Sequence, residues 1–180
     1  LLTGDFLHAE VRSYAVKCLK QFNHYRLSEF LIQLVQALKY EPHHLSDLAE
    51  YLLELAVQYP ATFGHTFFWC LRSEMYNQNI MHRYGLMLEV FLSKVGKRFY
   101  KFLESEIWLV NSLLKIADIP FDKKFKDKSM KESMLGSYRG ALKLLGENFG
   151  GKSVPLPTNF KKWVRGIVSE KCKVMKSKKR

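Results

Sequence analysis

Two stretches of the chain carry residue types that can hold a phosphate group. The first, residues 146–153, reads Gly-Glu-Asn-Phe-Gly-Gly-Lys-Ser and matches the phosphate-loop pattern G-x-x-x-x-G-K-[ST]. That chemistry needs a buried strand before the loop and a helix after it, so that backbone amides and the helix dipole point at the phosphates. Here residues 141–145 have a helical pattern, and Pro155 and Pro157 exclude a following helix. We therefore interpret this match as coincidental.

The second stretch is the basic tail. Residues 161–180 contain nine Lys or Arg against the single Glu170, whereas the net charge of the whole chain is +12. Such a tail fits a solvated flank, a nucleic-acid or membrane patch, or a phosphate-holding loop at a strand turn. No aromatic residue follows Trp163 to stack on bases, and Lys-Ser-Lys-Lys-Arg directly follows the strand-like residues 172–175. The phosphate-loop interpretation fits best.

No other group of residues has the spacing of a catalytic or metal site. Cys18, Cys70 and Cys172 are far apart and odd in number, which argues against a disulfide scaffold or zinc site and fits a reducing compartment. The six histidines form no recognised ligand or nucleophile pattern, and no kinase H-R-D or D-F-G motif is present. We expect His65 to be packed or capping, Trp69 to lie in the core, and Arg72 and Glu74 to lie at a helix edge.

Up to about residue 147, the secondary-structure elements that position these residues are predicted to be helices. Apolar residues recur at i, i+3, i+4 and i+7 in the stripes starting at Val11, Leu27 and Leu48, and further helices are expected over 63–75, 80–95, 97–117 and 129–147. The first stripe comprises Val11, Tyr14, Ala15, Cys18 and Leu19.

Capping and helix-ending residues occur where these predicted helices begin and end. Asn23 and Ser46 are plausible N-caps, Pro42 and Pro60 end helices, and Gly96 suits a left-handed stop. Residues 118–128 are expected to form a loop.

The stripe at Val11 recurs 37 residues later at Leu48, which predicts stacked helix pairs of the HEAT or armadillo kind. After residue 148 the pattern changes, because glycines and prolines exclude helix and the runs 163–168 and 172–175 are typical of strands. The predicted fold is thus mainly α, a superhelix of antiparallel helix pairs followed by a short β segment. No apolar run spans a bilayer, the N-terminus lacks signal-peptide order, and the missing starting Met suggests a piece of a longer chain.

Four stretches resemble the accessory (PIK) domain of phosphoinositide 3-kinase catalytic subunits, and the stretch 64–75 is similar to the class I enzymes in particular. Residues 11–19 resemble V-R-x-x-A-V-x-x-L, residues 31–41 L-x-Q-L-V-Q-x-L-K-Y-E, residues 64–75 G-H-F-x-F-W-x-L-[KR]-S-E-M, and residues 83–89 R-F-G-L-L-L-E. The resemblance is close over 1–100, fades over 101–160, and returns at 170–180, which is similar to E-x-C-R-I-M-S-S-A-K-R.

This resemblance implies the later helices of the accessory domain at 1–147, a linker at 148–160, and the first strands and phosphate loop of a truncated kinase lobe at 161–180. It implies that Met175 lines the adenine pocket and that Ser177 and Lys179 contact the phosphates of ATP. The chain departs from the family pattern at Lys176 and Lys178, where the family has small residues.

The resemblance also implies a parent lipid kinase that uses ATP and Mg²⁺, phosphorylates the 3-hydroxyl of a membrane phosphoinositide, and is cytoplasmic but recruited to the membrane surface. Expected partners are the other domains of the kinase and a regulatory subunit, with no nucleic acid. The piece itself is expected to be a non-catalytic scaffold without a cofactor. Two alternatives stay open: a free-standing HEAT-like interaction scaffold, and a nucleic-acid binder led by the basic tail, whose binding would fall steeply with salt.

Overall fold

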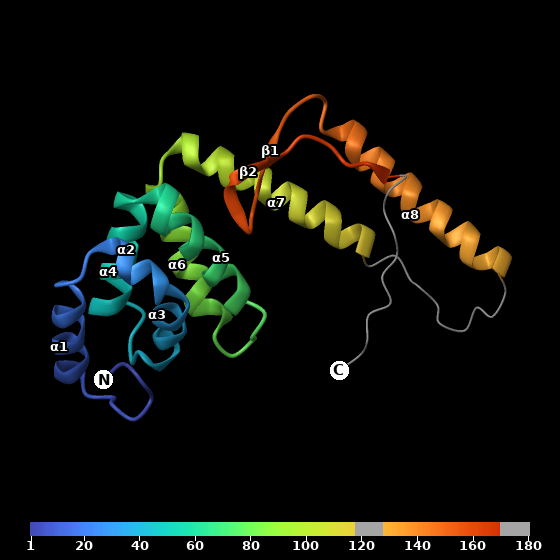
Figure 1. Ribbon diagram of the computed structural model, residues 1–180. Coiled ribbons are helices and arrows are strands. Elements are labelled where there is room, and N and C mark those ends of the chain that lie inside the picture. Colours follow the sequence, from blue (N-terminus) through green and yellow to red (C-terminus); the bar gives the residue numbers. More distant parts are fainter. Residues whose placement is uncertain (118–127, 170–180) are drawn as a thin grey trace. The chain divides into compact units, whose positions relative to one another are not determined.

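The computed structural model describes residues 1–117 and 128–169 (Figure 1). The described part is mostly helical and ends in a two-stranded antiparallel sheet. It divides into two compact units, Leu1–Tyr100 and a second that begins at Lys101. No helix among the described residues is both long and apolar enough to cross a membrane.

The first unit is built from two layers of helices. One layer holds α1 (Ala9–Leu19), α4 (Asp47–Gln58) and α6 (Met81–Lys94), with α4 packed against both of the others. These helices occur at the predicted interval of about 37 residues, because α4 follows α1 and α6 follows α4 at nearly that spacing. The predicted stack of helix pairs is confirmed for this unit.

The second layer consists of shorter helices and helical turns. It contains α2 (His24–Glu29), α3 (Leu31–Ala37) with its 3₁₀ extension η1 (Leu38–Tyr40), and α5 (His65–Glu74), which follows the π-helical turn η2 (Pro60–Gly64). Helix α5 packs on α3 and on α6, so it joins the two layers.

Aromatic side chains fill the core of this unit. Phe63, Phe67, Phe68 and Phe91 are fully buried, and the rings of Phe67 and Phe91 meet edge to face with centroids 5.7 Å apart. Fully burying a side chain of this size stabilises a fold by roughly 1.5–3 kcal/mol. Helix α5 has buried apolar residues on several of its faces because it contacts α3, α6 and η2.

The predicted caps and stops are confirmed. The side chain of Asn23 accepts a hydrogen bond from the Arg26 amide at 2.9 Å, and Ser46 accepts one from the Ala49 amide at 3.3 Å. Gly96 has φ of +84° between α6 and α7, a conformation that costs glycine nothing.

Three expectations for the first unit are wrong. The apolar stripe that starts at Leu27 is divided between two helices, α2 and α3, because the backbone leaves helical geometry at Phe30 (φ −106°, ψ 10°). The Phe30 ring turns outward to 59% exposure. Tyr14 is exposed, and Arg12 takes the buried position on α1 because it is paired. Trp69 is half-buried at the edge of α5, where the Arg72 guanidinium lies 5.7 Å from its ring centroid.

The second unit contains α7 (Lys97–Ala117, which begins in the first unit), α8 (Lys128–Asn148), β1 (Val154–Leu156) and β2 (Asn159–Val164). The two long helices match their predicted bounds within one residue. Leu109, Leu145, Phe149 and Val154 form its core, and the ring of Trp108 meets that of Phe149 edge to face at 5.4 Å. Of the loop predicted at 118–128, residues 118–127 lie outside the described residues, and Lys128 begins α8.

The strands begin earlier than expected. Strand β2 covers 159–164 and not 163–168, because residues 157–158 make a turn that lets it pair back on β1, with Val154 opposite Val164. Pro155 is tolerated because both strands of a two-stranded sheet are edge strands. The expected strand at 172–175 lies outside the described residues.

Candidate functional site

A cluster of buried polar contacts surrounds the carboxyl end of α3 and η1. A helix leaves its last carbonyl groups without partners in the helix, so other groups must satisfy them. Here side chains from α1 and α6 contribute: Arg12 donates to the carbonyl of Ala37, and Arg83 to that of Leu38, which also accepts the Glu41 amide at 3.1 Å. We call this cluster, comprising Arg12, Glu41, Arg83, Tyr84 and the carbonyls they contact, the α3 hub.

The centre of the hub is a buried ion pair. Arg12 Nε and Nη2 donate to Glu41 Oε1 at 2.9 and 2.6 Å, and the two side chains are 3% and 4% exposed. The remaining contacts of the guanidinium are to backbone carbonyls on either side. Nη1 donates to Thr3 and Phe6 at 3.2 and 3.0 Å, and Nη2 also lies 3.4 Å from the carbonyl oxygens of Leu2 and Ala37. An arginine with its planar set of donors suits this arrangement, whereas a lysine does not.

The other side of the hub is supplied by α6. Arg83 Nη1 donates to the carbonyls of Leu38 and His43 at 3.1 and 3.0 Å, which fixes the turn after η1. The Tyr84 hydroxyl donates to the Val35 carbonyl at 2.9 Å. Burial, followed by the nearby Glu74 carboxylate, raises the pKa of Tyr84 to about 12. The hydroxyl therefore stays a donor at every physiological pH.

Helix α5 adds a further polar contact to α3. Gln36 Nε2 donates to Glu74 Oε1 at 3.2 Å. Burial, followed by the charge of Glu74, raises the pKa of the Cys70 thiol to about 11. A thiol in that state is protonated at neutral pH and is a poor nucleophile or metal ligand. The predicted edge positions of Arg72 and Glu74 are confirmed, as is the burial of His65.

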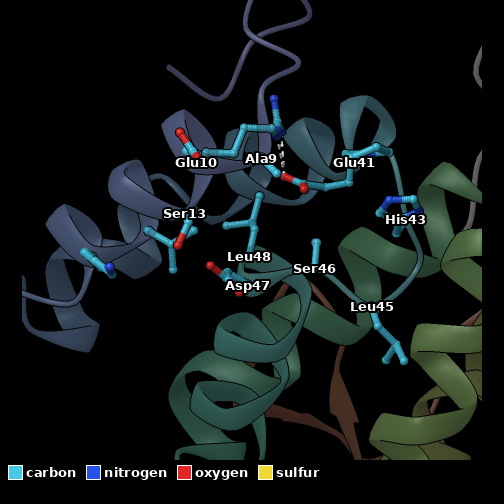
Figure 2. A pocket seen from close by; sticks show the side chains of 13 residues that line it. Ala9, Glu10, Ser13, Glu41, His43, Leu45, Ser46, Asp47 and Leu48 are labelled. Atoms are coloured by element: carbon cyan, nitrogen blue, oxygen red, sulfur yellow. Dashed lines mark hydrogen bonds and ion pairs between the residues drawn. The ribbon is translucent and has the colours of Figure 1, made fainter.

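A pocket of about 410 Å³ opens beside the hub, between α1, residues 41–46 and the start of α4 (Figure 2). The Arg12–Glu41 pair forms part of its wall, while Leu48 contributes apolar surface and Asp47 a carboxylate. Within residues 1–117 and 128–169, no group of three or more His, Cys, Asp or Glu side chains is placed to hold a metal ion. The hub side chains bind backbone carbonyls of α3 and η1, and these contacts join α1 and α6 to them.

The predicted nucleotide contacts Met175, Ser177 and Lys179 lie outside the described residues, so they remain a prediction. The interpretation of 146–153 as a coincidental match is confirmed. Helix α8 runs to Asn148, Gly150 and Gly151 turn the chain at φ of +52° and +76°, and β1 follows. The order is helix, turn, strand, which is the reverse of what a phosphate loop requires.

Sequence reasoning missed the hub residues Arg12, Glu41 and Arg83 as a group. A signal existed for Arg12, because it stands beside Val11 and ahead of Ala15 and Val16, on the side of α1 that is buried. A charged residue on an apolar face predicts a buried partner. The partner stands 29 positions away, so periodicity within α1 does not identify it.

Two layers of helix pairs, joined by buried polar contacts at their ends, define a helical scaffold of the HEAT or armadillo kind. Residues 1–104 match the model of the phosphoinositide 3-kinase family accessory domain, or PIK domain. This chain belongs to the phosphoinositide 3-kinase family. Of the four stretches that carry the resemblance, 31–41 forms α3 and η1, and the other three, 11–19, 64–75 and 83–89, each make a hydrogen bond to it.

Curated relatives agree with this placement. The chain is 34% identical over 185 residues to phosphatidylinositol 3-kinase 2 of Dictyostelium discoideum, covering 99% of this chain and 9% of the relative. It is 32% identical over 178 residues to the human phosphatidylinositol 4-phosphate 3-kinase C2 domain-containing subunit beta, covering 98% of this chain and 10% of the relative. The chain thus spans about a tenth of the length of the curated relatives it matches. Its assignment to class I remains a prediction.

Proposed function

We propose that this chain is the scaffold of a lipid kinase that transfers the γ-phosphate of ATP to the 3-hydroxyl of a phosphatidylinositol lipid. The scaffold itself does no chemistry. It holds the kinase lobes and the other domains of the enzyme in one orientation, because positioning is most of what phosphoryl transfer asks of a protein.

The observation that carries this proposal is the convergence of the family's stretches on the α3 hub. Residues 11–19 and 83–89 lie on α1 and α6, and both supply cations to the carbonyls that end α3 and η1. Such a network, with the Arg12–Glu41 pair buried at its centre, favours one packing of the helices, since alternatives leave that buried pair without its partners. A scaffold needs a single rigid arrangement of this kind.

The remaining parts of the proposal concern the enzyme as a whole. Its domains are the accessory helices at 1–147, a linker at 148–160 and the opening of the kinase lobe at 161–180. Met175 lines the adenine pocket, and Ser177 and Lys179 contact the phosphates of ATP, with Mg²⁺ bound elsewhere in the enzyme. A hydroxyl and an ammonium are suitable phosphate partners. The enzyme is a cytoplasmic signalling protein that reaches the membrane surface and binds a regulatory subunit.

The test is a lipid kinase assay with labelled ATP and phosphatidylinositol vesicles, run on the 180-residue chain and on the whole gene product. We expect phosphate transfer by the whole product and none by the chain. Transfer by the chain alone would refute its role as a non-catalytic scaffold. A folded whole product that transfers no phosphate would refute the kinase and favour a free-standing helical scaffold.

The phosphate contacts have a separate test in the whole product. Ser177→Ala and Lys179→Met should raise the KM for ATP by about tenfold, the equivalent of one lost charge-assisted hydrogen bond. The matched control is Lys161→Met, which removes an exposed charge from β2. An unchanged KM in both site variants would remove these residues from the nucleotide site.

A further inference from the structure

The segment that precedes α1 is held on the helices by very little apolar burial. We call residues 1–7 the strap. Its apolar side chains are largely in solvent, with Leu1, Phe6 and Leu7 at 52%, 43% and 61% exposure. Its own hydrogen bonds, from the Phe6 amide to the Thr3 carbonyl and from the Thr3 hydroxyl to Asp5, do not attach it to any helix.

Hydrogen bonds from one side chain hold the strap on the helices. The Arg12 guanidinium donates to three strap carbonyls, those of Leu2, Thr3 and Phe6. The backbone of Gly4 also packs so closely on the Tyr40 ring that an added Cβ would lie 3.0 Å from it. The strap therefore lies against Tyr40, the last residue of η1, and Glu41 directly follows it.

The same guanidinium is oriented by Glu41. Nε and Nη2 both donate to Glu41 Oε1, and this leaves Nη1 pointing at the strap carbonyls. The donors of a guanidinium are fixed in one plane, so its bonds to Glu41 and its bonds to the strap depend on the same orientation of the side chain. Loss of the carboxylate contact thus frees the side chain to turn away from the strap.

We propose that Arg12 and Glu41 form a latch that holds the strap closed on η1, and that breaking the pair releases the strap while helices α4, α5 and α6 stay folded. The strap opens separately because its release exposes little apolar surface, whereas opening the helices exposes the buried phenylalanine core. The fold thus contains a detachable segment controlled by one ion pair.

The test is native-state digestion of the full 180-residue chain with chymotrypsin, following cleavage after Phe6 and Leu7 by mass spectrometry. Cleavage requires the strap to leave the helices, so its rate reports strap opening. We expect Arg12→Lys and Glu41→Gln to speed this cleavage at least about tenfold. The matched control Arg26→Lys, on the exposed side of α2, should leave the rate unchanged. Amide hydrogen exchange in α4–α6 should accelerate far less than strap cleavage does, because these helices keep their buried core.

A second variant keeps the test decisive if a single change prevents folding. Replacing both partners, Arg12→Met with Glu41→Met, removes the latch without leaving a buried charge unpaired, and such replacements are often neutral for stability. This folded double variant should show the same fast cleavage of the strap. Strap cleavage at the unaltered rate, or an equal acceleration of exchange throughout α4–α6, would overturn the latch.

Discussion

The hydroxyl of Tyr84 donates a hydrogen bond of 2.9 Å to the backbone carbonyl of Val35, which joins α6 to α3 across 49 positions of sequence. Both residues are completely buried. The carbonyl belongs to the last turns of α3, where it also accepts a backbone amide hydrogen bond at the end of the helix. The phenol on one helix thus adds a second hydrogen bond to a buried backbone carbonyl of another.

Removing this hydroxyl should weaken the fold without opening a cavity of any size. We expect Tyr84→Phe to lower the free energy of unfolding by about 1 kcal/mol, the typical net value of a buried hydrogen bond. Urea unfolding followed by circular dichroism measures the change. Tyr14→Phe is the matched control, because Tyr14 is 62% exposed and should tolerate the change. Equal losses in the two variants would mean that the Val35 contact contributes nothing.

The same hydroxyl should make stability fall at high pH. Burial raises the pKa of folded Tyr84 to about 12, whereas an unfolded tyrosine titrates near 10. Between these values the unfolded state loses the proton first, so the stability present below about pH 10 declines as pH rises towards 12. Comparing the unfolding free energies of the unaltered chain and Tyr84→Phe at pH 9 and pH 11 isolates this residue. Parallel pH profiles would contradict the raised pKa.

Gly64 should tolerate no side chain. A Cβ there would lie 2.5 Å from the Ala56 carbonyl oxygen and 3.1 Å from the Phe91 ring, and the carbonyl belongs to the backbone of α4. We expect Gly64→Ala to cost at least about 2 kcal/mol, as overpacking does. Gly136→Ala, in an exposed part of α8 with nothing within 4 Å, should instead stabilise by about 0.5–1 kcal/mol. Thermal unfolding of both variants measures the contrast, and equal melting temperatures would refute it.

Cys70 should react slowly with thiol reagents at neutral pH. Its pKa lies at about 11 because burial and then the Glu74 charge disfavour the thiolate, which is the reactive form. In a chain carrying Cys18→Ser and Cys172→Ser, alkylation by iodoacetamide should be far slower than that of a small free thiol at pH 7.5. The rate should rise about tenfold per pH unit until the pKa is approached. Neutral-pH labelling at the rate of the free thiol would rule out the raised value.

Local patterns were sufficient for most of the helices of this protein. The caps at Asn23 and Ser46, the stop at Gly96 and the bounds of α7 and α8 depend on neighbours within a few positions of sequence. The interval between α1 and α4 likewise predicted which helices pack together, because repeated pairs stack on their neighbours. Predictions failed where packing overrode periodicity, as at Phe30, whose kink turns an apolar ring to solvent.

The candidate site divides in the same way. The sequence alone showed the resemblance of four stretches to one family. It also indicated that the phosphate-loop match at 146–153 is coincidental. The sequence by itself therefore determined the helices, their repeat and the family. Only the tertiary structure decided that those four stretches meet at the end of α3, with Arg12 paired to Glu41 and Tyr84 to Val35. Pairings over 29 and 49 positions leave no local periodicity, because they are set by how helices stack and not by how each one forms.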